Sequence, residues 1–417
     1  MEIYEYLEKS VTAFHTVNNS QKMLLEAGFQ EIYMEDSWNL DKGKYFICPY
    51  SSTLFAFTIG EEVEDIKIGM AHTDFPSLKV KPNSEIKASS YLRINVEPYG
   101  GLLKDTWFDK PLAVAGKLIL KSEDVFMPKT LLVDSEKPLF VIPSLAPHMR
   151  GKDKKEEIDV QVELIPLCLL PQHRESTDFI LDYFVDKMKV NKEEVIDWDI
   201  FLYNADKPSG IGIENELLLS PRLDNLVSSW MLTKSIIEGE NKNGINLMAL
   251  FDHEEVGSRS KSGADSMMLL NVIDKMFFNL GFDLDKKLKL FSRGFMLSID
   301  GAHGLHPNYS QKSDITNQIS LGDGIVIKTS ASQRYISDSE GSGVVIGLCN
   351  RDNIKYKKQV NRSGMPGGQT LGPIASSYIP IRGADIGIPM LAMHSANELV
   401  AKSDIEELNR LLTGYFI

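Results

Sequence analysis

The sequence predicts an α/β protein interrupted by a β-rich insertion, and two observations carry this prediction. Helix and strand patterns alternate over residues 1–80 and again over 216–417, which is typical of a mostly parallel sheet covered by helices. Between these parts, residues 81–215 contain many strand patterns and few helical ones. We therefore expect one discontinuous α/β domain with a separate module inserted into it.

The first part of the α/β domain contains a helix followed by buried strands. In residues 17–27, apolar side chains fall on one side of a helix, and Gly28 supplies a stop signal at its C-terminus. Residues 53–60 and 65–74 are rich in β-branched and apolar residues. The run at 65–74 predicts a buried strand whose carboxyl end is the segment Ala71-His72-Thr73-Asp74.

The insertion is dominated by strand patterns. Residues 158–164 alternate between apolar and polar side chains, which is typical of a strand with one buried face. The charged stretch 151–157 indicates a solvated loop. A helix at 179–190 and a strand at 197–203 lead out of the insertion. With so little helix, we expect an all-β module.

The second part of the α/β domain returns to alternating elements. Apolar spacing predicts helices at 223–239 and 263–281, each closed by a glycine. Apolar runs predict strands at 245–255, 295–300 and 385–395. No internal repeat interrupts this order.

The composition excludes several classes of protein. Acidic residues outnumber basic ones by 58 to 45, which gives a net charge of −13. Nucleic acids and anionic membranes need a basic protein surface, so we expect neither as a partner. Cys48, Cys168 and Cys349 have no zinc-finger spacing and predict no disulfide framework. The chain start lacks a signal-peptide pattern, and no apolar run reaches the roughly 18 residues of a membrane helix. We expect a cytoplasmic protein.

Potential metal ligands follow the ends of four predicted strands. They lie in His72–Asp74, in Asp252–Glu255, at Asp300 and at His394, and Asp224 stands at the start of an amphipathic helix. In an open α/β sheet, the carboxyl ends of the strands line the crevice in which ligands bind. Carboxylates gathered there would repel one another and be costly to desolvate without a cation. The sequence therefore predicts a pair of divalent metal ions, and nitrogen and oxygen ligands suit Zn²⁺, or alternatively Co²⁺ or Mn²⁺.

Glu254 and Glu255 suggest how such a site would work. Neighbouring residues at a strand end point to opposite sides, so we expect one glutamate to bind metal and the other to act as general base toward a water molecule. The residues alone leave open which glutamate has which role. Ions in a two-metal site lie roughly 3.5–4 Å apart and are often joined by a carboxylate. Asp224 is the candidate for this bridge.

The same residues also have plainer interpretations. Asp224 could cap its helix, and Glu254 and Glu255 could be two solvated charges in a turn. His303 and His306 would over-fill a metal site, so we interpret them as structural or hydrogen-bonding histidines.

At this point the sequence resembles the M18 metallo-aminopeptidases, the aspartyl aminopeptidase family. The similarity extends over nearly the whole chain and consists of many motifs in one order. The motifs include AHTDFPSLKVKP (71–82), LSPRLDNL (219–226), FDHEEVGS (251–258), SIDGAHGLHPNY (298–309), GIVIKTSASQRY (324–335), MPGGQTLGP (365–373) and GIPMLAMHS (387–395).

This resemblance implies a co-catalytic pair of metal ions. By motif matching, His72 and Asp300 would hold one ion, Glu255 and His394 would hold the other, and Asp224 would bridge them.

The resemblance also implies roles for the residues around the metals. Glu254 would be the general base, and Asp74 would orient the imidazole of His72. His148 would reach the substrate site from a neighbouring subunit, Lys328 would face an acidic substrate side chain, and Tyr335 would donate a hydrogen bond near the reacting carbonyl.

At the level of the whole protein, the resemblance implies a zinc-exopeptidase-like α/β/α sandwich with an inserted dimerisation domain. It implies a homo-oligomer, commonly a tetrahedral dodecamer built from dimers, that removes acidic N-terminal residues from peptides. Two other interpretations remain open at this stage. One is a different co-catalytic zinc hydrolase, such as an M42-type aminopeptidase or an M20-type deacylase, and the other is a catalytically silent scaffold with the same fold.

Overall fold

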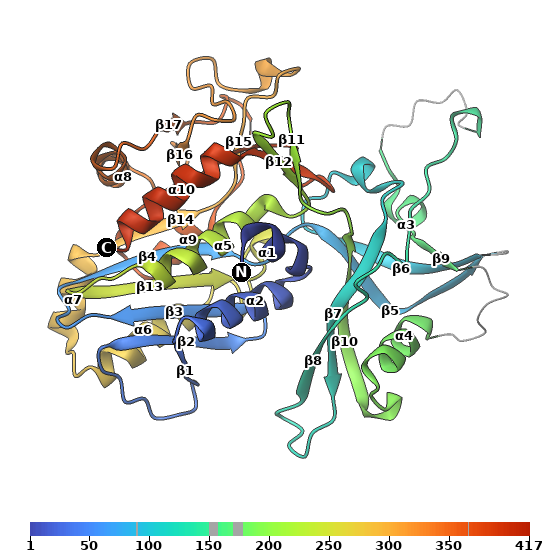
Figure 1. Ribbon diagram of the computed structural model, residues 1–417, viewed down its shortest axis with the longest axis horizontal. Coiled ribbons are helices and arrows are strands. Elements are labelled where there is room, and N and C mark those ends of the chain that lie inside the picture. The colour runs from blue at the N-terminus through green and yellow to red at the C-terminus, as the bar shows by residue number, and fades with distance from the viewer. Residues whose placement is uncertain (89–90, 150–156, 170–177, 366) are drawn as a thin grey trace. The chain divides into compact units, whose positions relative to one another are not determined.

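The computed structural model covers residues 1–417, and the description below applies to all of them except 89–90, 150–156, 170–177 and 366. The chain forms two compact units (Figure 1). The first comprises Met1–Asp74, Pro208–Met393 and Glu398–Ile417, and the second comprises Phe75–Lys207 and His394–Asn397. The second unit thus begins at residue 75 where the sequence suggests 81, and its main segment ends at 207 where the sequence suggests 215.

A nine-stranded sheet forms the centre of the first unit. In spatial order its strands are β1 (Gln30–Glu31), β2 (Gly43–Tyr50), β3 (Thr53–Ile59), β13 (Gly244–Phe251), β4 (Asp65–His72), β14 (Phe295–Ile299), β18 (Arg382–Gly387), β16 (Ile325–Lys328) and β17 (Tyr356–Gln359). The four strands β13, β4, β14 and β18 are parallel, so their carboxyl ends meet at one edge of the sheet.

Helices pack on both faces of this sheet, as Figure 1 shows. Helices α1 (Ile3–Lys9), α2 (Ala13–Glu26), α5 (Leu223–Glu238), α8 (Ser339–Arg351) and α10 (Lys402–Tyr415) form one layer. Helices α6 (Met268–Asn279), α7 (Leu284–Arg293) and α9 (Leu371–Tyr378) share a buried apolar cluster with the opposite face of the sheet. The predicted α/β class is confirmed.

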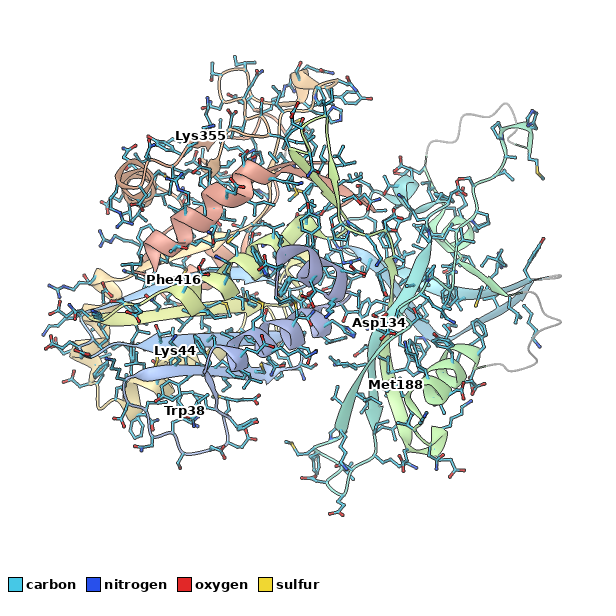
Figure 2. The ribbon with its side chains drawn as sticks, in the orientation of Figure 1. Trp38, Lys44, Asp134, Met188, Lys355 and Phe416 are labelled. Carbon is cyan, nitrogen blue, oxygen red and sulfur yellow. The ribbon has the colours of Figure 1, made fainter. Side chains whose placement is uncertain are left out.

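The core of this unit is built by the alternation of apolar side chains along the strands. In β4, Ile66, Ile68 and Met70 face the α6 layer, and Trp38 joins this cluster from the loop before β2 (Figure 2). Gly69 faces helix α5 instead, where a Cβ atom would lie 2.5 Å from Leu232 Cδ2. Glycine therefore lets α5 pack closely on the strand that ends at His72 without displacing the Leu232 side chain.

A five-stranded sheet completes the first unit. Its order is β11 (Ser209–Ile211), β12 (Leu217–Ser220), β20 (Glu398–Ala401), β19 (Pro389–Leu391) and β15 (Ala302–His303). The strand predicted at 385–395 is therefore wrong in part: the chain leaves the large sheet after β18 and enters the smaller sheet as β19. Pro389 cannot donate a ladder hydrogen bond, which favours a break between the two strands.

The second unit is built on a six-stranded antiparallel sheet. Its order is β8 (Lys129–Asp134), β7 (Leu112–Leu120), β10 (Val195–Asn204), β5 (Ser77–Ala88), β6 (Tyr91–Tyr99) and β9 (Leu167–Leu169). Helix α4 (Phe179–Met188) packs on the apolar face of this sheet through Phe179, Ile180 and Phe184. The charged stretch 151–157 lies outside the described residues except for Glu157.

The prediction of a strand at 158–164 is wrong. Residues Val160–Glu163 form the short helix α3, and with α4 the unit is not purely β. The Asp159 carboxylate accepts a hydrogen bond from Gln161 N at 3.0 Å, and Glu163 Oε1 accepts one from Asp159 N at 2.6 Å. These reciprocal caps satisfy the first N–H groups of a helix and override the alternating apolar pattern.

None of the helices in the described part of the chain combines the length and apolarity needed to cross a membrane.

Candidate metal centre

His72 lies at the centre of the candidate site. It is the last residue of β4 and pairs in register with Phe251 at the end of the parallel strand β13. Its side chain is 1% exposed, and its backbone carbonyl accepts a hydrogen bond from Ser229 Oγ of α5 at 2.6 Å. The imidazole is therefore held between the sheet and the helix that packs on it.

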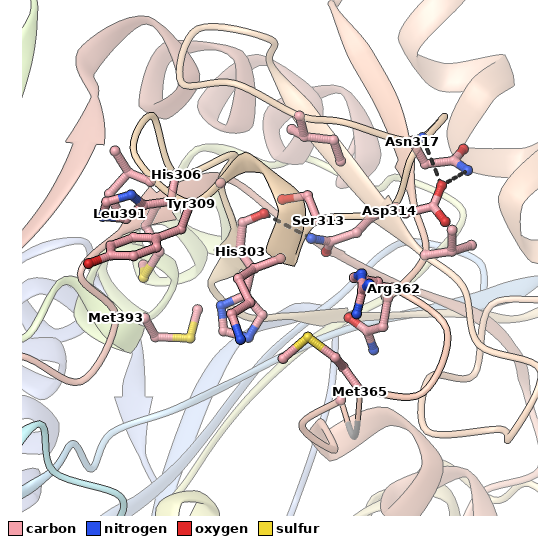
Figure 3. A pocket seen from close by; sticks show the side chains of 18 of the residues that line it. His303, His306, Tyr309, Ser313, Asp314, Asn317, Arg362, Met365, Leu391 and Met393 are labelled. Atoms are coloured by element: carbon pink, nitrogen blue, oxygen red, sulfur yellow. Dashed lines mark hydrogen bonds between the residues drawn. The ribbon is translucent and has the colours of Figure 1, made fainter.

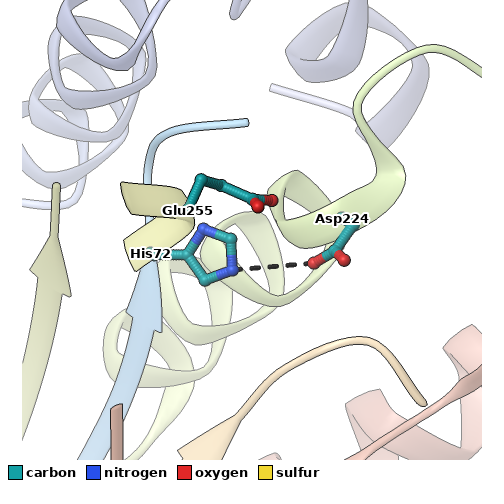
Figure 4. Close-up of side chains that lie close together, drawn as sticks. All are labelled: His72, Asp224 and Glu255. Carbon is teal, nitrogen blue, oxygen red and sulfur yellow. Dashed lines mark ion pairs between the residues drawn. The ribbon is translucent and has the colours of Figure 1, made fainter. Parts of the chain in front are cut away.

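Three carboxylate-bearing residues converge on this imidazole. His72 Nε2 lies 3.6 Å from Asp224 Oδ1 and 3.4 Å from Asp300 Oδ1. One ligand atom from each of His72, Asp224 and Glu255 lies within 4.8 Å of the others, and Figure 4 shows these side chains directed toward a common space. The structure thus brings together four residues that the sequence predicts as metal ligands.

Asp224 lies at a kink near the start of helix α5. Arg222 stands at the N-cap of this helix without a capping hydrogen bond from its side chain, and Asp224 and Asn225 have non-helical backbone. The backbone at Asp224 is extended (φ −83°, ψ 105°), and the following peptide bond is cis. Asp224 N donates to Glu398 Oε2 at 2.9 Å, and Asn225 Nδ2 donates to Ile299 O at 2.7 Å.

The Glu254-Glu255 pair lies on a single turn of 3₁₀ helix, Glu254–Val256, rather than on extended chain. His253 enters this turn with a left-handed backbone (φ 62°), as Gly257 does where it leaves (φ 96°). The expectation that the glutamates point to opposite sides rests on extended geometry and does not apply. The backbone of the 3₁₀ turn sets the direction of the two glutamate side chains.

Asp74 connects this turn to His72. Its Oδ1 and Oδ2 atoms accept hydrogen bonds from Glu254 N at 3.1 Å and Glu255 N at 3.2 Å. The same carboxylate lies 3.4 Å from His72 Nδ1, which also lies 3.0 Å from the Asp74 backbone carbonyl. One buried carboxylate therefore orients both the imidazole and the segment that carries the two glutamates.

The electrostatics of the cluster show an excess of buried negative charge. Burial, with additional repulsion from neighbouring carboxylates, raises the pKa of Glu254 to about 8 and that of Glu255 well above its usual value. Burial and the charge of Asp74 likewise raise the pKa of Asp252 to about 6. In the absence of a cation, these acids can be accommodated only by retaining protons.

Two positive groups offset part of this charge. Burial alone would lower the pKa of His72, but its hydrogen bonds to Asp224, Asp300 and Asp74 raise it well above its usual value. Burial would raise the pKa of Asp300, but the nearby Lys328 ammonium and His72 lower it far below its usual range. The remaining acids fit a site for divalent cations, since their oxygen atoms and the imidazole nitrogen are the donors that Zn²⁺, Co²⁺ and Mn²⁺ accept.

Lys328 is a buried member of this cluster. It lies in β16, which has strands on both sides, and the residue is 2% exposed. Its Nζ atom donates to Gly301 O at 2.6 Å and lies 3.5 Å from Asp300 Oδ2. The Tyr335 ring is buried, with its centroid 5.7 Å from Nζ.

Two predicted site residues belong to the second unit. His394 has a left-handed backbone (φ 66°), and its Nδ1 atom lies 3.0 Å from Gly101 O. A Cβ atom on Gly101 would lie 3.2 Å from this nitrogen, so glycine permits the close approach. His148 lies in the exposed 3₁₀ turn Pro147–Met149. The structure thus groups His72, Asp224, Glu255 and Asp300 in the first unit, with His394 and His148 in the second.

Sequence reasoning missed one residue of the site. Glu398, at the start of β20, is buried and accepts the hydrogen bond from Asp224 N. Its sequence context, an apolar strand pattern, gives no sign of this contact, because the contact depends on pairing between β12 and β20.

Comparison with known proteins identifies the family. The family model described as "Aminopeptidase I zinc metalloprotease (M18)" matches residues 6–416. A "Probable M18 family aminopeptidase 2" from Clostridium novyi (strain NT) is 42% identical over 410 residues, covering 97% of this chain and 95% of its own. "Aspartyl aminopeptidase 4" from Saccharomyces cerevisiae is 34% identical over 458 residues, covering 100% of this chain and 94% of its own. A chain in the cryo-EM structure of the Ape4 and Nbr1 complex superposes with a TM-score of 0.94 at 29% identity, over 99% of this chain and 84% of that one. The motifs, the fold and these relatives lead to one conclusion: this chain belongs to the M18 family of metallo-aminopeptidases.

Proposed function

We propose that this metallo-aminopeptidase uses two divalent metal ions, most simply Zn²⁺, to release N-terminal residues from peptides, with a preference for Asp and Glu. The observation that carries the proposal is the gathering of His72, Asp224 and Glu255, whose ligand atoms lie within 4.8 Å of one another. Such a concentration of buried acids beside an imidazole is stable only with protons or cations. Because the chain belongs to a family of metallopeptidases, we propose that cations, and not protons alone, neutralise these acids in the active protein.

The ligands divide between the two ions as follows. His72 and Asp300 would hold one ion, Glu255 and His394 would hold the other, and Asp224 would bridge them. The short distances from His72 Nε2 to Asp224 and Asp300 support this division. His394 enters the set through its motif alone.

The chemistry of the reaction follows from the same residues. When bound, a pair of divalent ions supplies Lewis acidity that activates water and polarises the peptide carbonyl. Glu254 would accept the proton of the attacking water and transfer it to the leaving amine. Asp74 would keep Glu254 in place through its hydrogen bond to the Glu254 backbone N–H. Tyr335 would donate a hydrogen bond near the reacting carbonyl.

The acidic preference rests on two separate supports. One relative that is 34% identical is an aspartyl aminopeptidase. In this chain, the Lys328 ammonium supplies positive charge beside Asp300, and we propose that it also attracts an acidic substrate side chain.

The assembly and the compartment are further parts of the proposal. We propose a homo-oligomer in which the second unit forms the dimer contact and His148 reaches the substrate site of a neighbouring subunit. A yeast protein of this fold, mApe1, has been solved as a dodecamer. None of the three cysteines of the chain forms a disulfide bond, which supports a reducing compartment such as the cytoplasm. Light scattering coupled to size-exclusion chromatography would measure the assembly.

A substrate screen tests the catalytic proposal. The purified protein would be assayed on a panel of N-terminal aminoacyl substrates with Zn²⁺, Co²⁺ or Mn²⁺, before and after chelation. We expect chelation to abolish turnover, metal to restore it, and Asp and Glu substrates to react fastest. An amine-blocked peptide should not be cleaved. The match to the M18 family model decides against the M42-type and M20-type alternatives. A protein that binds no metal and cleaves no peptide would instead be a silent scaffold.

A further inference from the structure

A pocket of about 300 Å³ in the first unit lies outside the set of proposed metal ligands. It is formed by the loops that follow β15, β17 and β19 (Figure 3). His303 on its wall comes three residues after Asp300. Gln359 on its wall donates to His303 O at 2.9 Å and pairs in register with Lys328 of the neighbouring strand. The pocket is therefore linked to the Asp300–Lys328 pair through both the chain and the sheet.

Cationic and imidazole side chains are concentrated around this pocket. Arg362, Lys312, His303 and His306 all line it. Arg362 is exposed, and its guanidinium makes no hydrogen bond or ion pair with any residue that the structure describes. In Figure 3, the side chains of His303 and Arg362 point toward the space beside Met365. An available guanidinium at the rim of a pocket is suited to bidentate binding of a carboxylate.

One acidic residue, Asp314, lies on the described pocket wall, and its carboxylate forms hydrogen bonds within its own loop. Asp314 Oδ1 accepts hydrogen bonds from Thr316 N at 3.0 Å, Asn317 N at 2.9 Å and Asn317 Nδ2 at 2.8 Å. These bonds lower the pKa of Asp314 to about 2, with the Asn317 side chain as the largest contribution. The carboxylate is thus turned toward its own loop, as Figure 3 shows.

Methionine side chains form an apolar and adaptable part of the wall. Met365, Met390 and Met393 contribute flexible thioether side chains. On another part of the wall, the His306 and Tyr309 rings lie with centroids 4.9 Å apart, and His306 Nδ1 accepts from Asn308 N. A ligand that combines a carboxylate with an aliphatic chain matches this surface better than a fully hydrated inorganic anion does.

We propose that this pocket binds a carboxylate of the peptide substrate, with Arg362 as its principal cation and the methionines covering the adjoining chain. This inference rests on the proposed aminopeptidase function and adds a binding site to it. The carboxylate can come from the side chain of the first residue or from that of the second residue. A carboxylate from either residue would bind Arg362 in the same way. Peptides that carry the aspartate at the first or at the second position therefore distinguish the two sources.

The test compares three amidated tripeptides on the oligomeric, metal-loaded enzyme: Asp-Leu-Leu, Leu-Asp-Leu and Leu-Leu-Leu. We expect Arg362→Gln to lower kcat/KM for one acidic peptide relative to Leu-Leu-Leu by about tenfold, mainly through KM. The affected peptide identifies the source of the carboxylate. Arg362→Lys should recover part of the discrimination, since it keeps the charge but loses the planar fork.

The matched control is Arg382→Gln. Arg382 is also an exposed arginine of the first unit, but it lies at the start of β18, whereas the pocket adjoins the chain beyond its end. This variant should discriminate among the peptides as wild type does. Added salt should weaken the preference of the wild type for the affected acidic peptide. The same salt should have a smaller effect on Arg362→Gln, which lacks the charge that salt screens.

Three outcomes would overturn the inference. The first is an unchanged ratio for both acidic peptides in Arg362→Gln. The second is an equal change in the Arg382→Gln control. The third is a loss of inhibition by inorganic phosphate with no change in peptide discrimination, which would make the pocket a site for free oxyanions. Failure of the wild type to cleave any of the three peptides would instead overturn the proposed aminopeptidase function, and this inference with it.

Discussion

The substitution Asp74→Asn tests whether one carboxylate organises the candidate metal centre. In the native protein, Asp74 accepts hydrogen bonds from Glu254 N and Glu255 N, and it lies 3.4 Å from His72 Nδ1. Asparagine keeps the shape but replaces one oxygen by an N–H₂ group, so one backbone N–H faces another donor. Losing one buried hydrogen bond to a charged group costs about 1.5–3 kcal/mol.

This loss should appear in both metal affinity and folding stability. We expect the affinity for Zn²⁺, measured by competition with a chromogenic chelator, to fall by about 10–100-fold, the usual effect of removing a residue that orients a metal ligand. The free energy of unfolding of the metal-loaded protein, in which bound cations offset the repulsion between these acids, should fall by about 2 kcal/mol in urea titrations. Asp65→Asn is the matched control, because Asp65 lies at the opposite end of the same strand and accepts from Asn241 Nδ2. Metal affinity within twofold of wild type in Asp74→Asn, or an equal loss in Asp65→Asn, would refute the role given to Asp74.

Three further predictions concern the reaction itself. Glu254→Gln should lower turnover by about 10²–10⁴-fold while metal content, measured by atomic emission, stays at the wild-type level, because the variant removes only the proton acceptor. Unchanged turnover would exclude Glu254 as the base. Lys328→Met should reduce kcat/KM for aspartyl substrates more than for leucyl substrates, since it removes a buried positive charge. An equal loss on both would restrict Lys328 to its pairing with Asp300. Chelation should remove all activity, and titration with Zn²⁺ should restore it as two equivalents bind; full activity with one equivalent would contradict the two-metal proposal.

The sequence was informative where function depends on strand ends. The apolar runs that end at His72, Phe251 and Ile299 predict buried parallel strands, and the residues that follow them do lie at one edge of the sheet. This edge follows from the parallel arrangement and not from any single motif, because parallel strands bring their carboxyl ends together whatever the loops between them contain.

Other features depended on contacts that a linear pattern does not encode. The alternation at 158–164 predicted a strand, yet the side chains of Asp159 and Glu163 cap a helix there. The role of Glu398 depends on one backbone N–H, that of Asp224. Arg362 has no distinctive neighbours in the sequence, and its position at a pocket is set by loops from three separate strands. In each case the interaction joins segments whose proximity is decided by the fold.

The excess of acids at the metal centre also predicts an unusual pH dependence for the metal-free protein. The pKa of Glu254 is raised from 4.5 to about 8, and that of Asp252 from 3.8 to about 6. An acid with a raised pKa binds more protons in the folded state than in the unfolded state at intermediate pH. Its contribution therefore favours folding at low pH and is lost as the pH rises through the folded-state pKa. The raised pKa of His72 acts in the same direction.

The free energy of unfolding of the chelator-treated protein should consequently decrease as the pH rises from about 4.5 to about 8. Each pKa unit corresponds to about 1.4 kcal/mol, and solvent screening reduces the total to a few kcal/mol. Glu254→Gln should flatten this slope, because glutamine does not titrate, and Zn²⁺ should reverse it, because the ligands bind metal only when deprotonated. Urea titrations across this pH range would measure the free energy of unfolding of the chelator-treated wild type, of Glu254→Gln and of the Zn²⁺-bound protein. If Glu254→Gln leaves this slope unchanged, burial does not raise the pKa of Glu254. The electrostatic argument for a metal site would then be wrong.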